Sequence, residues 1–427
     1  MRIKHYLTLG SIALVVLLLP FLLRFYQNKT IAGGLSYFYL SAFPSLFPFS
    51  FAYQWLISIT LTLLFLLLVL FIVHSCNVSA EKEFIIMLFM IATPTTLYLS
   101  SQPTVYLYAL LCIAASLSIL STRFYYLSII PLTGLLFFDW TVLLSGVVYI
   151  IAYLIFFDKK KLLPIPLSFL LLFTIIHFIY SRPFAFAQLA ERSYLVELFS
   201  DLGGVYGFSL FIVLLSIIGL AFTWRWKKEY IPLYGLIFVL CLLVFWSRAA
   251  LLFLYPLLSV LAAHAFTYFW KREWVLPFVH ILTIAVLCYG ILFSMLSYGT
   301  TIVFGPPGAD MIDGVQWLRS HPFYYDDVVL SHQKNGFFID YGSKAFVTPL
   351  SSVQTVNVST TIFQSKDFKK TQGLLRENAI SLILIDPTMK REVWKTEDDG
   401  LLYLFRTSGY FVKVYDADGI EMWRVKE

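Results

Sequence analysis

The residues of this sequence that suit chemistry at a membrane surface are a few acids and arginines set between long apolar runs. The acids are Asp139, Glu191, Glu197 and Asp201, and the arginines are Arg24, Arg182, Arg192 and Arg248. Charged groups at membrane depth or at helix ends are costly, so they tend to mark ligand sites or pathways. The planar guanidinium of arginine holds two phosphate oxygens at once, which favours a phosphate ligand.

Each of these residues also has a simpler role open to it. Arg24 lies at the end of an apolar run, where it can anchor the helix at the interface, and the same role is open to Arg248. Asp139 can cap the helix that follows it, and Asp201 can belong to a solvated face. The sequence contains no phosphate-cradling glycine loop, paired zinc histidines or nucleophile elbow. The cysteines indicate apolar packing rather than a disulfide or metal site: Cys76, Cys112, Cys241 and Cys288.

The composition is that of a membrane protein with a separate polar end. Of the 427 residues 59% are hydrophobic and 13% charged, against about a quarter charged in a soluble domain. Residues 1–300 hold 17 Lys and Arg against 9 Asp and Glu, whereas residues 301–427 hold 14 against 16. We therefore predict a transmembrane domain over 1–300, a Gly- and Pro-rich linker over 301–309 and an α/β domain over 310–427. The positive charge lies in loops, so it argues for topology and not for a nucleic-acid partner.

Apolar runs of roughly the 20 residues that cross a bilayer predict about eleven transmembrane helices. The basic start Met1–Tyr6 and the run to Leu23 indicate a retained signal-anchor helix. The runs Tyr126–Phe138 and Val142–Phe157 are short, so they are either two tilted spans or a hairpin that crosses in part. The predicted spans are Tyr6–Leu23, Tyr53–Val73, Phe84–Leu99, Val105–Leu120, Tyr126–Phe138, Val142–Phe157, Leu163–Tyr180, Gly207–Thr223, Ile231–Trp246, Leu251–Phe269 and Val275–Tyr298.

The distribution of Lys and Arg sets the predicted orientation. With the N-terminus inside, the inner loops hold twelve Lys and Arg and the outer loops five, as the positive-inside rule requires. This predicts a multi-pass protein of the cell membrane with a cytoplasmic N-terminus and an extracytoplasmic C-terminal domain. The loops around Arg24, Asp139, Asp201 and Arg248 then face outward, and Asn28-Lys-Thr30 and Asn357-Val-Ser359 match the glycosylation pattern on that side.

The C-terminal region changes its periodicity and alternates predicted helices with strands. Helices are expected over Asp310–Ser320, Lys366–Asn378 and Gly400–Ser408, and a buried strand over Ser381–Ile385. Further strands are expected over Asp327–Ser331, Ala345–Thr348, Phe411–Tyr415 and Glu421–Val425, the last two joined by the turn Asp416-Ala-Asp-Gly419. Such alternation is typical of a small α/β domain.

Four stretches of the sequence resemble a known class of membrane protein. They are Gly33–Ala42, Ala92–Pro103, Phe199–Phe208, and Val315–Arg319 with Asp327–Ser331. In order, they look like the first outer loop, the third-span end with the second outer loop, the long loop returning to the membrane, and the start of the outer globular domain in the GT-C superfamily of integral-membrane glycosyltransferases. The resemblance is to oligosaccharyltransferase catalytic subunits and protein mannosyltransferases of archaeal or bacterial type.

The resemblance implies a polytopic α-helical GT-C-like fold and glycosyl transfer at the outer membrane face. It implies a polyprenyl-phosphate-linked sugar and membrane lipid as partners, and a divalent cation, Mg²⁺ or Mn²⁺, as cofactor. The sequence departs from the family where it matters for catalysis. The first-loop acid would fall near Leu35, and the second near Gln102–Tyr106, where no acid stands. Asp139 and Asp201 are then the candidate catalytic acids, and Arg24, Arg248 and Arg182 the candidate ligands of the lipid phosphate.

Three functions stay open on the sequence alone. The first is a polyprenyl-phosphate-sugar-dependent glycosyltransferase that uses Asp139 or Asp201. The second is a catalytically inactive GT-C-like protein that binds a lipid-linked glycan or a partner, as the leucine at position 35 suggests. The third is a transporter or flippase, which would need polar residues along the spans and an inverted repeat. The apolar runs hold almost no such residues and show no repeat.

Overall fold

The computed structural model divides the chain into two compact units. The helical unit comprises Met1–Leu23 and Tyr53–Phe304, and the C-terminal unit comprises Gly305–Glu427 together with Arg24–Ala52. The structure describes residues 2–26, 54–76, 78–101, 105–135, 140–157, 162, 166, 168, 199–202, 208–247, 250–304, 309–321, 328–332, 335, 339, 346–348, 353–394, 396, 398–417 and 419–426.

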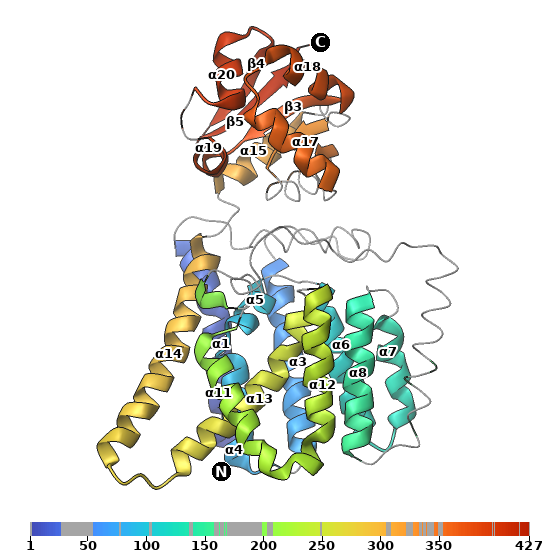
Figure 1. Cartoon of the computed structure of the whole chain (residues 1–427), viewed down its shortest axis with the longest axis vertical. Helices are drawn as coiled ribbons and strands as arrows, with labels where there is room; N and C mark the ends of the chain where they lie inside the picture. Colours follow the sequence, from blue (N-terminus) through green and yellow to red (C-terminus); the bar gives the residue numbers. More distant parts are fainter. Residues whose placement is uncertain are drawn as a thin grey trace. The chain divides into compact units, whose positions relative to one another are not determined.

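The helical unit is a bundle whose helices run alternately in opposite directions (Figure 1). They are rich in Leu, Ile, Val and Phe on all sides, and a helix that is apolar all round is typical of a membrane span. Its helices are α1 (Arg2–Tyr26), α3 (Gln54–Ser75), α4 (Ala80–Ile91), α5 (Pro94–Ser101), α6 (Val105–Leu120), α7 (Ile129–Gly134), α8 (Trp140–Phe156), α11 (Leu210–Thr223), α12 (Lys227–Trp246), α13 (Ala250–Lys271) and α14 (Pro277–Phe304), with short 3₁₀ turns η2 (Tyr125–Ser128), η5 (Ser200–Leu202) and η6 (Trp224–Trp226).

Four of the described helices are long and apolar enough to cross a membrane: His5–Leu23, Leu56–Ser75, Ala250–Lys271 and Pro277–Thr300. The pair α4 and α5 passes the same test as one span bent by 59°. Shorter apolar helices cover Tyr106–Leu120, Trp140–Phe156, Leu210–Trp226 and Tyr230–Phe245. The protein is therefore a helical chain with several candidate spans, while the count of eleven and the orientation stay predictions.

The bend between α4 and α5 differs from the straight span expected over Phe84–Leu99. Pro94 has no N–H, so it leaves the carbonyl of Met90, four residues earlier, without its helical partner. Three hydroxyls take that place, since Thr93, Thr96 and Tyr255 contact the Met90 carbonyl at 3.0, 2.5 and 3.1 Å. Thr96 and Tyr255 also contact each other at 2.8 Å. The break is thus built into the buried core and tied to α13.

A buried carboxylate joins the other ends of α1, α3 and α4. The Glu83 side chain is 2% exposed. It accepts a hydrogen bond from the Tyr6 hydroxyl at 3.0 Å and lies 3.5 Å from His74 Nδ1. Because a buried polar group needs hydrogen-bond partners, these contacts join the three helices through Glu83.

The C-terminal unit is a five-stranded sheet with the order β2-β1-β3-β5-β4. The strands are β1 (Val328–Leu330), β2 (Phe346–Thr348), β3 (Ile380–Ile385), β4 (Phe411–Ala417) and β5 (Ile420–Val425). β1 pairs with β2 and β3 in parallel, and β5 pairs with β3 and β4 antiparallel. Its helices are α15 (Ala309–Ser320), α17 (Val353–Gln364), α18 (Phe368–Glu377), α19 (Pro387–Glu392) and α20 (Gly400–Thr407).

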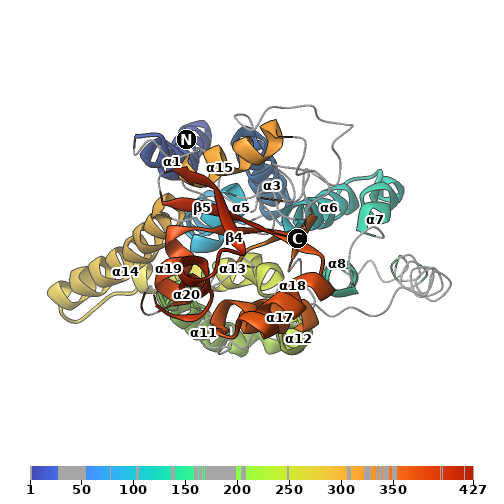
Figure 2. The ribbon, with the colours of Figure 1, turned by 90° about the horizontal axis from the view of Figure 1, so that it is seen from above.

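Helices cover both faces of this sheet (Figure 2). Successive residues of β3 point to opposite faces. Leu382 and Leu384 pack in the core under α15, whereas Ile383 and Ile385 pack in the core formed with α17 to α20. A strand buried on both faces reads as a continuous apolar run, which explains why β3 is evident in the sequence.

The region expected to be a linker is partly helical. α14 continues through Phe304, and α15 begins at Ala309, so 301–304 and 309 of the predicted linker 301–309 belong to helices. The residues Thr301-Ile-Val-Phe304 are apolar or β-branched and give no stop signal, whereas Pro306 and Pro307 follow directly. A proline disfavours helix in the residue before it, so the stop signal falls after Phe304.

Candidate active site

One of the predicted site residues, Asp201, has a described side chain. Arg24 lies in the last turns of α1, and its side chain is not among those described. Asp139, Arg182 and Arg248 lie outside the described residues, as do Glu191 and Glu197. The site is therefore built here from Asp201 and the elements around it.

Asp201 lies in the 3₁₀ turn η5 and caps the start of α11. Its Oδ2 accepts the backbone N–H of Leu210 at 2.8 Å, and its Oδ1 accepts the hydroxyl of Ser294 on α14 at 2.5 Å. A carboxylate at this position satisfies one of the free N–H groups of a helix start and interacts favourably with the helix dipole. Asp201 thus ties the turn η5, the helix α11 and the helix α14 together.

Two fully buried serines extend this hydrogen-bond network. Ser209 precedes α11, and its Oγ accepts the Phe211 N–H at 3.2 Å. Ser294 Oγ lies 2.7 Å from Ser209 Oγ. Since the single hydroxyl proton of Ser294 goes to Asp201, Ser209 donates to Ser294. Ser200 closes the same turn through its N–H and hydroxyl, which reach the Phe208 carbonyl at 3.0 and 3.2 Å.

The alternating direction of the helices brings this network and several helix ends to one end of the bundle (Figure 1). α1 ends there at Tyr26, two residues after Arg24, and α8, α11 and α13 begin there with Trp140, Leu210 and Ala250. In the sequence, Asp139 immediately precedes α8, and Arg248 lies two residues before the start of α13. Tyr255 in the second turn of α13 and the bend before α5 belong to the same half of the bundle. The hydroxyl cluster of Thr93, Thr96 and Tyr255 was not predicted, and Pro94 and Pro256 are the sequence signals that could have indicated it.

The described acids do not form a metal site. Among the residues that the structure describes, no group of three or more His, Cys, Asp and Glu side chains could hold a metal ion. Both oxygens of Asp201 already accept hydrogen bonds from the protein. Asp201 therefore does not belong to a described set of ligands for the divalent cation that the resemblance implies.

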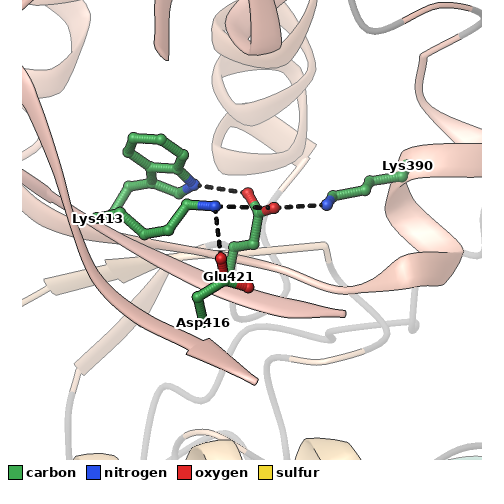
Figure 3. A network of polar contacts seen from close by, with 5 residues as sticks. Lys390, Lys413, Asp416 and Glu421 are labelled. Atoms are coloured by element: carbon green, nitrogen blue, oxygen red, sulfur yellow. Dashed lines mark hydrogen bonds and ion pairs between the residues drawn. The ribbon is translucent and has the colours of Figure 1, made fainter. Parts of the chain in front are cut away.

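A second charged network lies on the sheet of the C-terminal unit (Figure 3). Glu421 on β5 contacts Lys390 on α19 at 2.7 Å and Lys413 on β4 at 3.2 Å, and it accepts the indole N–H of Trp423 at 3.0 Å. Lys413 also bonds Asp416 at 2.9 Å. Asp416 and Glu421 face each other across the hairpin, so Lys413 relieves the repulsion between two like charges.

The pKa shifts in this network follow from competing causes. Partial burial would raise the pKa of Glu421, but the hydrogen bonds from Lys390 and Trp423 and the Lys390 charge outweigh it and lower the pKa. For Lys413, burial acts to lower the pKa, and the bonds to Asp416 and Glu421 outweigh it and raise the pKa. Lys390, Lys413, Asp416 and Glu421 each have a partner of opposite charge within the network. We therefore interpret the network as a structural contact of the hairpin and not as a ligand site.

The predicted glycosylation pattern at Asn357 falls on a helix. Asn357-Val-Ser359 lies within α17, and Ser359 is buried. An acceptor sequence has to be reached in an exposed segment, so this pattern is not usable in the folded unit. The matching pattern at Asn28 lies outside the described residues.

Comparisons with known proteins show which solved structures share this fold. A scan against protein-family models finds no match, and a search of curated proteins finds none. Among solved structures, the apo crystal structure of the Archaeoglobus fulgidus oligosaccharyltransferase matches with a TM-score of 0.52 and 11% identity, covering 100% of this chain and 74% of that one. That enzyme belongs to the GT-C superfamily.

Two further structures of the same archaeal enzyme match less closely. The one tethered to an acceptor peptide with the NVT sequon has a TM-score of 0.45 and 10% identity, covering 93% of this chain and 66% of that one. The complex of AglB with an inhibitory peptide and a dolichol-phosphate has a TM-score of 0.37 and 11% identity, covering 88% and 56%. The match at a TM-score of 0.52 confirms the predicted resemblance at the level of the fold, which this chain shares with an archaeal oligosaccharyltransferase.

Proposed function

We propose that this protein is a membrane glycosyltransferase that moves a sugar from a polyprenyl-phosphate carrier to an acceptor at the outer membrane face. The observation that carries the proposal is the match of the whole chain to the fold of the archaeal oligosaccharyltransferase. The apolar bundle supplies a surface for the carrier. The C-terminal α/β unit follows the last helix, α14, in sequence, and we propose that it is extracytoplasmic.

Asp201 is the described residue best suited to act on an acceptor hydroxyl. A carboxylate has about four acceptor positions, and the Leu210 N–H and the Ser294 hydroxyl occupy two of them. The remaining positions can take a proton from the acceptor in general base catalysis. The same two bonds hold the carboxylate rigidly, as a positioned base requires. Asp139 is the alternative acid, since it precedes α8 at the same end of the bundle.

The arginines are proposed to hold the carrier phosphate. Arg24 lies in the last turns of α1, and Arg248 lies two residues before the start of α13 in the sequence. A guanidinium that meets a phosphate in a partly apolar setting forms strong paired hydrogen bonds. Arg182 is assigned the same role from its place in the sequence. A divalent cation remains a proposal from the resemblance alone.

The second candidate is a non-catalytic relative that binds a lipid-linked glycan or a partner. Two observations favour it: Leu35 stands where the resemblance places an acid, and Asp201 is engaged as a helix cap. In this case the apolar bundle and the arginines keep their roles, and no acid turns the substrate over.

The glycosyltransferase and the non-catalytic relative are distinguished by whether the protein transfers a sugar. The full-length protein in phosphatidylcholine nanodiscs is mixed with polyprenyl phosphate, and then with polyprenyl-phosphate-linked hexoses and peptide or glycan acceptors. Binding of polyprenyl phosphate with sugar transfer supports the enzyme. Binding without transfer for any donor supports the non-catalytic relative, and no binding at all contradicts both.

A further inference from the structure

Two turns at the end of the helical unit away from Asp201 carry exposed aromatic and basic side chains. α11 separates them from Asp201 by 14 residues, which corresponds to about 21 Å along a helix. We call the side chains of these turns the basic aromatic patch. It comprises Trp224, Arg225, Trp226, Lys227 and Lys228 after α11, and Tyr268, Trp270, Arg272 and Trp274 around the end of α13.

The two turns lie side by side and form one surface. Phe222, at the end of α11, contacts Tyr268 with ring centroids 4.2 Å apart and Phe269 at 6.0 Å. Trp274 packs on Phe269 at 6.3 Å and donates its indole N–H to the Phe269 carbonyl. These contacts join the end of α11 to the end of α13.

Two cations of the patch, Lys227 and Arg272, lie over aromatic rings. Lys227 Nζ is 5.6 Å from the centre of the Trp224 ring, and Arg272 Cζ is 6.0 Å from Tyr268 and 5.9 Å from Trp274. A ring beneath a cation holds it in place without neutralising it. Trp224 is 59% exposed, so these pairs present fixed positive charge at the surface.

Among the described side chains of these two turns, the exposed cations outnumber the exposed acids. Lys271 pairs with Glu81 at 2.5 Å and is left out of the patch for that reason. Arg225, Lys227, Lys228 and Arg272 are exposed, and Glu273 is the exposed acid between these cations and α14. The patch therefore favours an anionic ligand.

The helices that adjoin the patch present exposed apolar side chains beside it. On α14 and just before it these are Leu276, Phe278 and Ile281, with exposed fractions of 61%, 72% and 68%. On α11, Leu214 and Ile217 are 49% and 59% exposed. Trp and Tyr at the boundary between an apolar and a charged surface are typical of the lipid headgroup region. A ligand that matches both surfaces has acyl chains joined to an anionic head.

We propose that the basic aromatic patch binds the phosphate headgroups of anionic phospholipids, with their acyl chains along α11 and α14. Each cation near an anionic lipid surface strengthens binding about fivefold. Arg272 and Lys227 each approach a headgroup from one of the two turns. The aromatic rings hold these cations at the depth of the lipid phosphate.

The test compares lipids on the purified full-length protein in detergent. Native mass spectrometry measures the apparent Kd for phosphatidylglycerol, for phosphatidylcholine with the same chains, and for soluble glycerol phosphate. We expect phosphatidylglycerol to bind at least tenfold more tightly than phosphatidylcholine, and glycerol phosphate to compete weakly. Equal affinity for the two lipids overturns the proposal, and full competition by glycerol phosphate makes the site one for soluble phosphate.

Substitutions test whether the basic aromatic patch causes the preference for phosphatidylglycerol over phosphatidylcholine. The double substitution Lys227→Gln with Arg272→Gln should weaken phosphatidylglycerol binding about thirtyfold, which is about 2 kcal/mol at 1.4 kcal/mol per tenfold, and leave phosphatidylcholine binding unchanged. The matched control is Lys369→Gln with Arg376→Gln on the exposed face of α18, which should keep the wild-type preference. Exchange of the two cations, Lys227→Arg with Arg272→Lys, should keep most of it. A double Gln variant that retains the wild-type preference overturns the assignment.

Discussion

Asp201 caps α11, and its hydrogen bonds allow the stability loss of Asp201→Ala to be estimated. Replacement by alanine removes the acceptor of the Leu210 N–H and of the Ser294 hydroxyl. Loss of a helix cap costs about 1 kcal/mol, and loss of a hydrogen bond to a charged group costs about 1.5–3 kcal/mol. Ser294 keeps its contact with Ser209, so the second term falls at the low end. We expect Asp201→Ala to lower the free energy of unfolding by about 2.5 kcal/mol.

Thermal unfolding in detergent measures this loss. At roughly 2–4 °C per kcal/mol for a unit of about 150–250 residues, Asp201→Ala should lower Tm by roughly 5–10 °C. Amide exchange in the first turn of α11 should rise at the same time. Asp201→Asn keeps an acceptor oxygen and should lose less than half as much. The control is Glu273→Ala, which removes an exposed acid of the same unit. Equal Tm values for Asp201→Ala and Glu273→Ala, with unchanged exchange at Leu210, would refute the capping role.

Three other substitutions test separate parts of the fold. Tyr255→Phe removes one of three hydroxyls at the α4–α5 bend, so the free energy of unfolding should fall by about 1 kcal/mol; an unchanged Tm would contradict this contact. In Gly219→Ala the new methyl group meets a backbone carbonyl of α13, so the free energy of unfolding should fall by about 1–3 kcal/mol. The control Gly235→Ala has open space around the new methyl group and should raise the free energy of unfolding by about 0.5–1 kcal/mol. Equal shifts in Tm for the two variants would contradict the close packing of α11 and α13. The lowered pKa of Glu421 means that its stabilisation is present above its unfolded pKa of about 4.3 and is lost as the pH falls through the folded value. Glu421→Gln should therefore destabilise the C-terminal unit at pH 7 and flatten its loss of Tm between pH 5 and pH 3; an unchanged acid profile would show that the ion pairs do not matter.

Much of the C-terminal unit could be predicted because its signals are local. The run Ser381–Ile385 is apolar on both faces of a sheet, and it forms the central part of β3. The turn predicted at Asp416–Gly419 includes the last two residues of β4 and leads into β5, and Gly419 has the positive φ of 84° that such a turn favours. These features depend on neighbours in the sequence, so they can be recognised without the structure.

The helices α17 and α19 were not expected from the sequence. α17 contains Val353, Val356, Val358 and several threonines, whose β-branched side chains favour strands when packing is ignored. Packing of α17 against α20 and β3 outweighs this strand preference and stabilises the helix. α19 has the start signal of a cap at Asp386 followed by Pro387, but it is too short for a periodic apolar pattern.

The candidate site could be predicted only in part. Asp201 was predicted from the sequence as a candidate catalytic acid. Its hydrogen bond to Ser294, which is 93 residues away, could not be predicted. The bend after α4 likewise depends on Tyr255, which is 165 residues from Met90. Such contacts follow from the packing of helices, and no local pattern reports them. The proposal for Asp139, Arg182 and Arg248 therefore rests on their positions in the sequence and on the shared fold.

Sugar transfer by variants of the two candidate acids tests the proposed glycosyltransferase most directly. Membranes containing wild type, Asp139→Asn, Asp201→Asn or the control Glu273→Gln are supplied with a polyprenyl-phosphate-linked sugar, and the transferred sugar is measured per folded protein. We predict transfer by wild type and by Glu273→Gln, and a loss of about 10²-fold or more in one of the two Asn variants, as expected when a general base is removed. Transfer that both Asn variants retain would contradict the assignment of the acid, and no transfer by the wild type with any donor would contradict the enzyme itself.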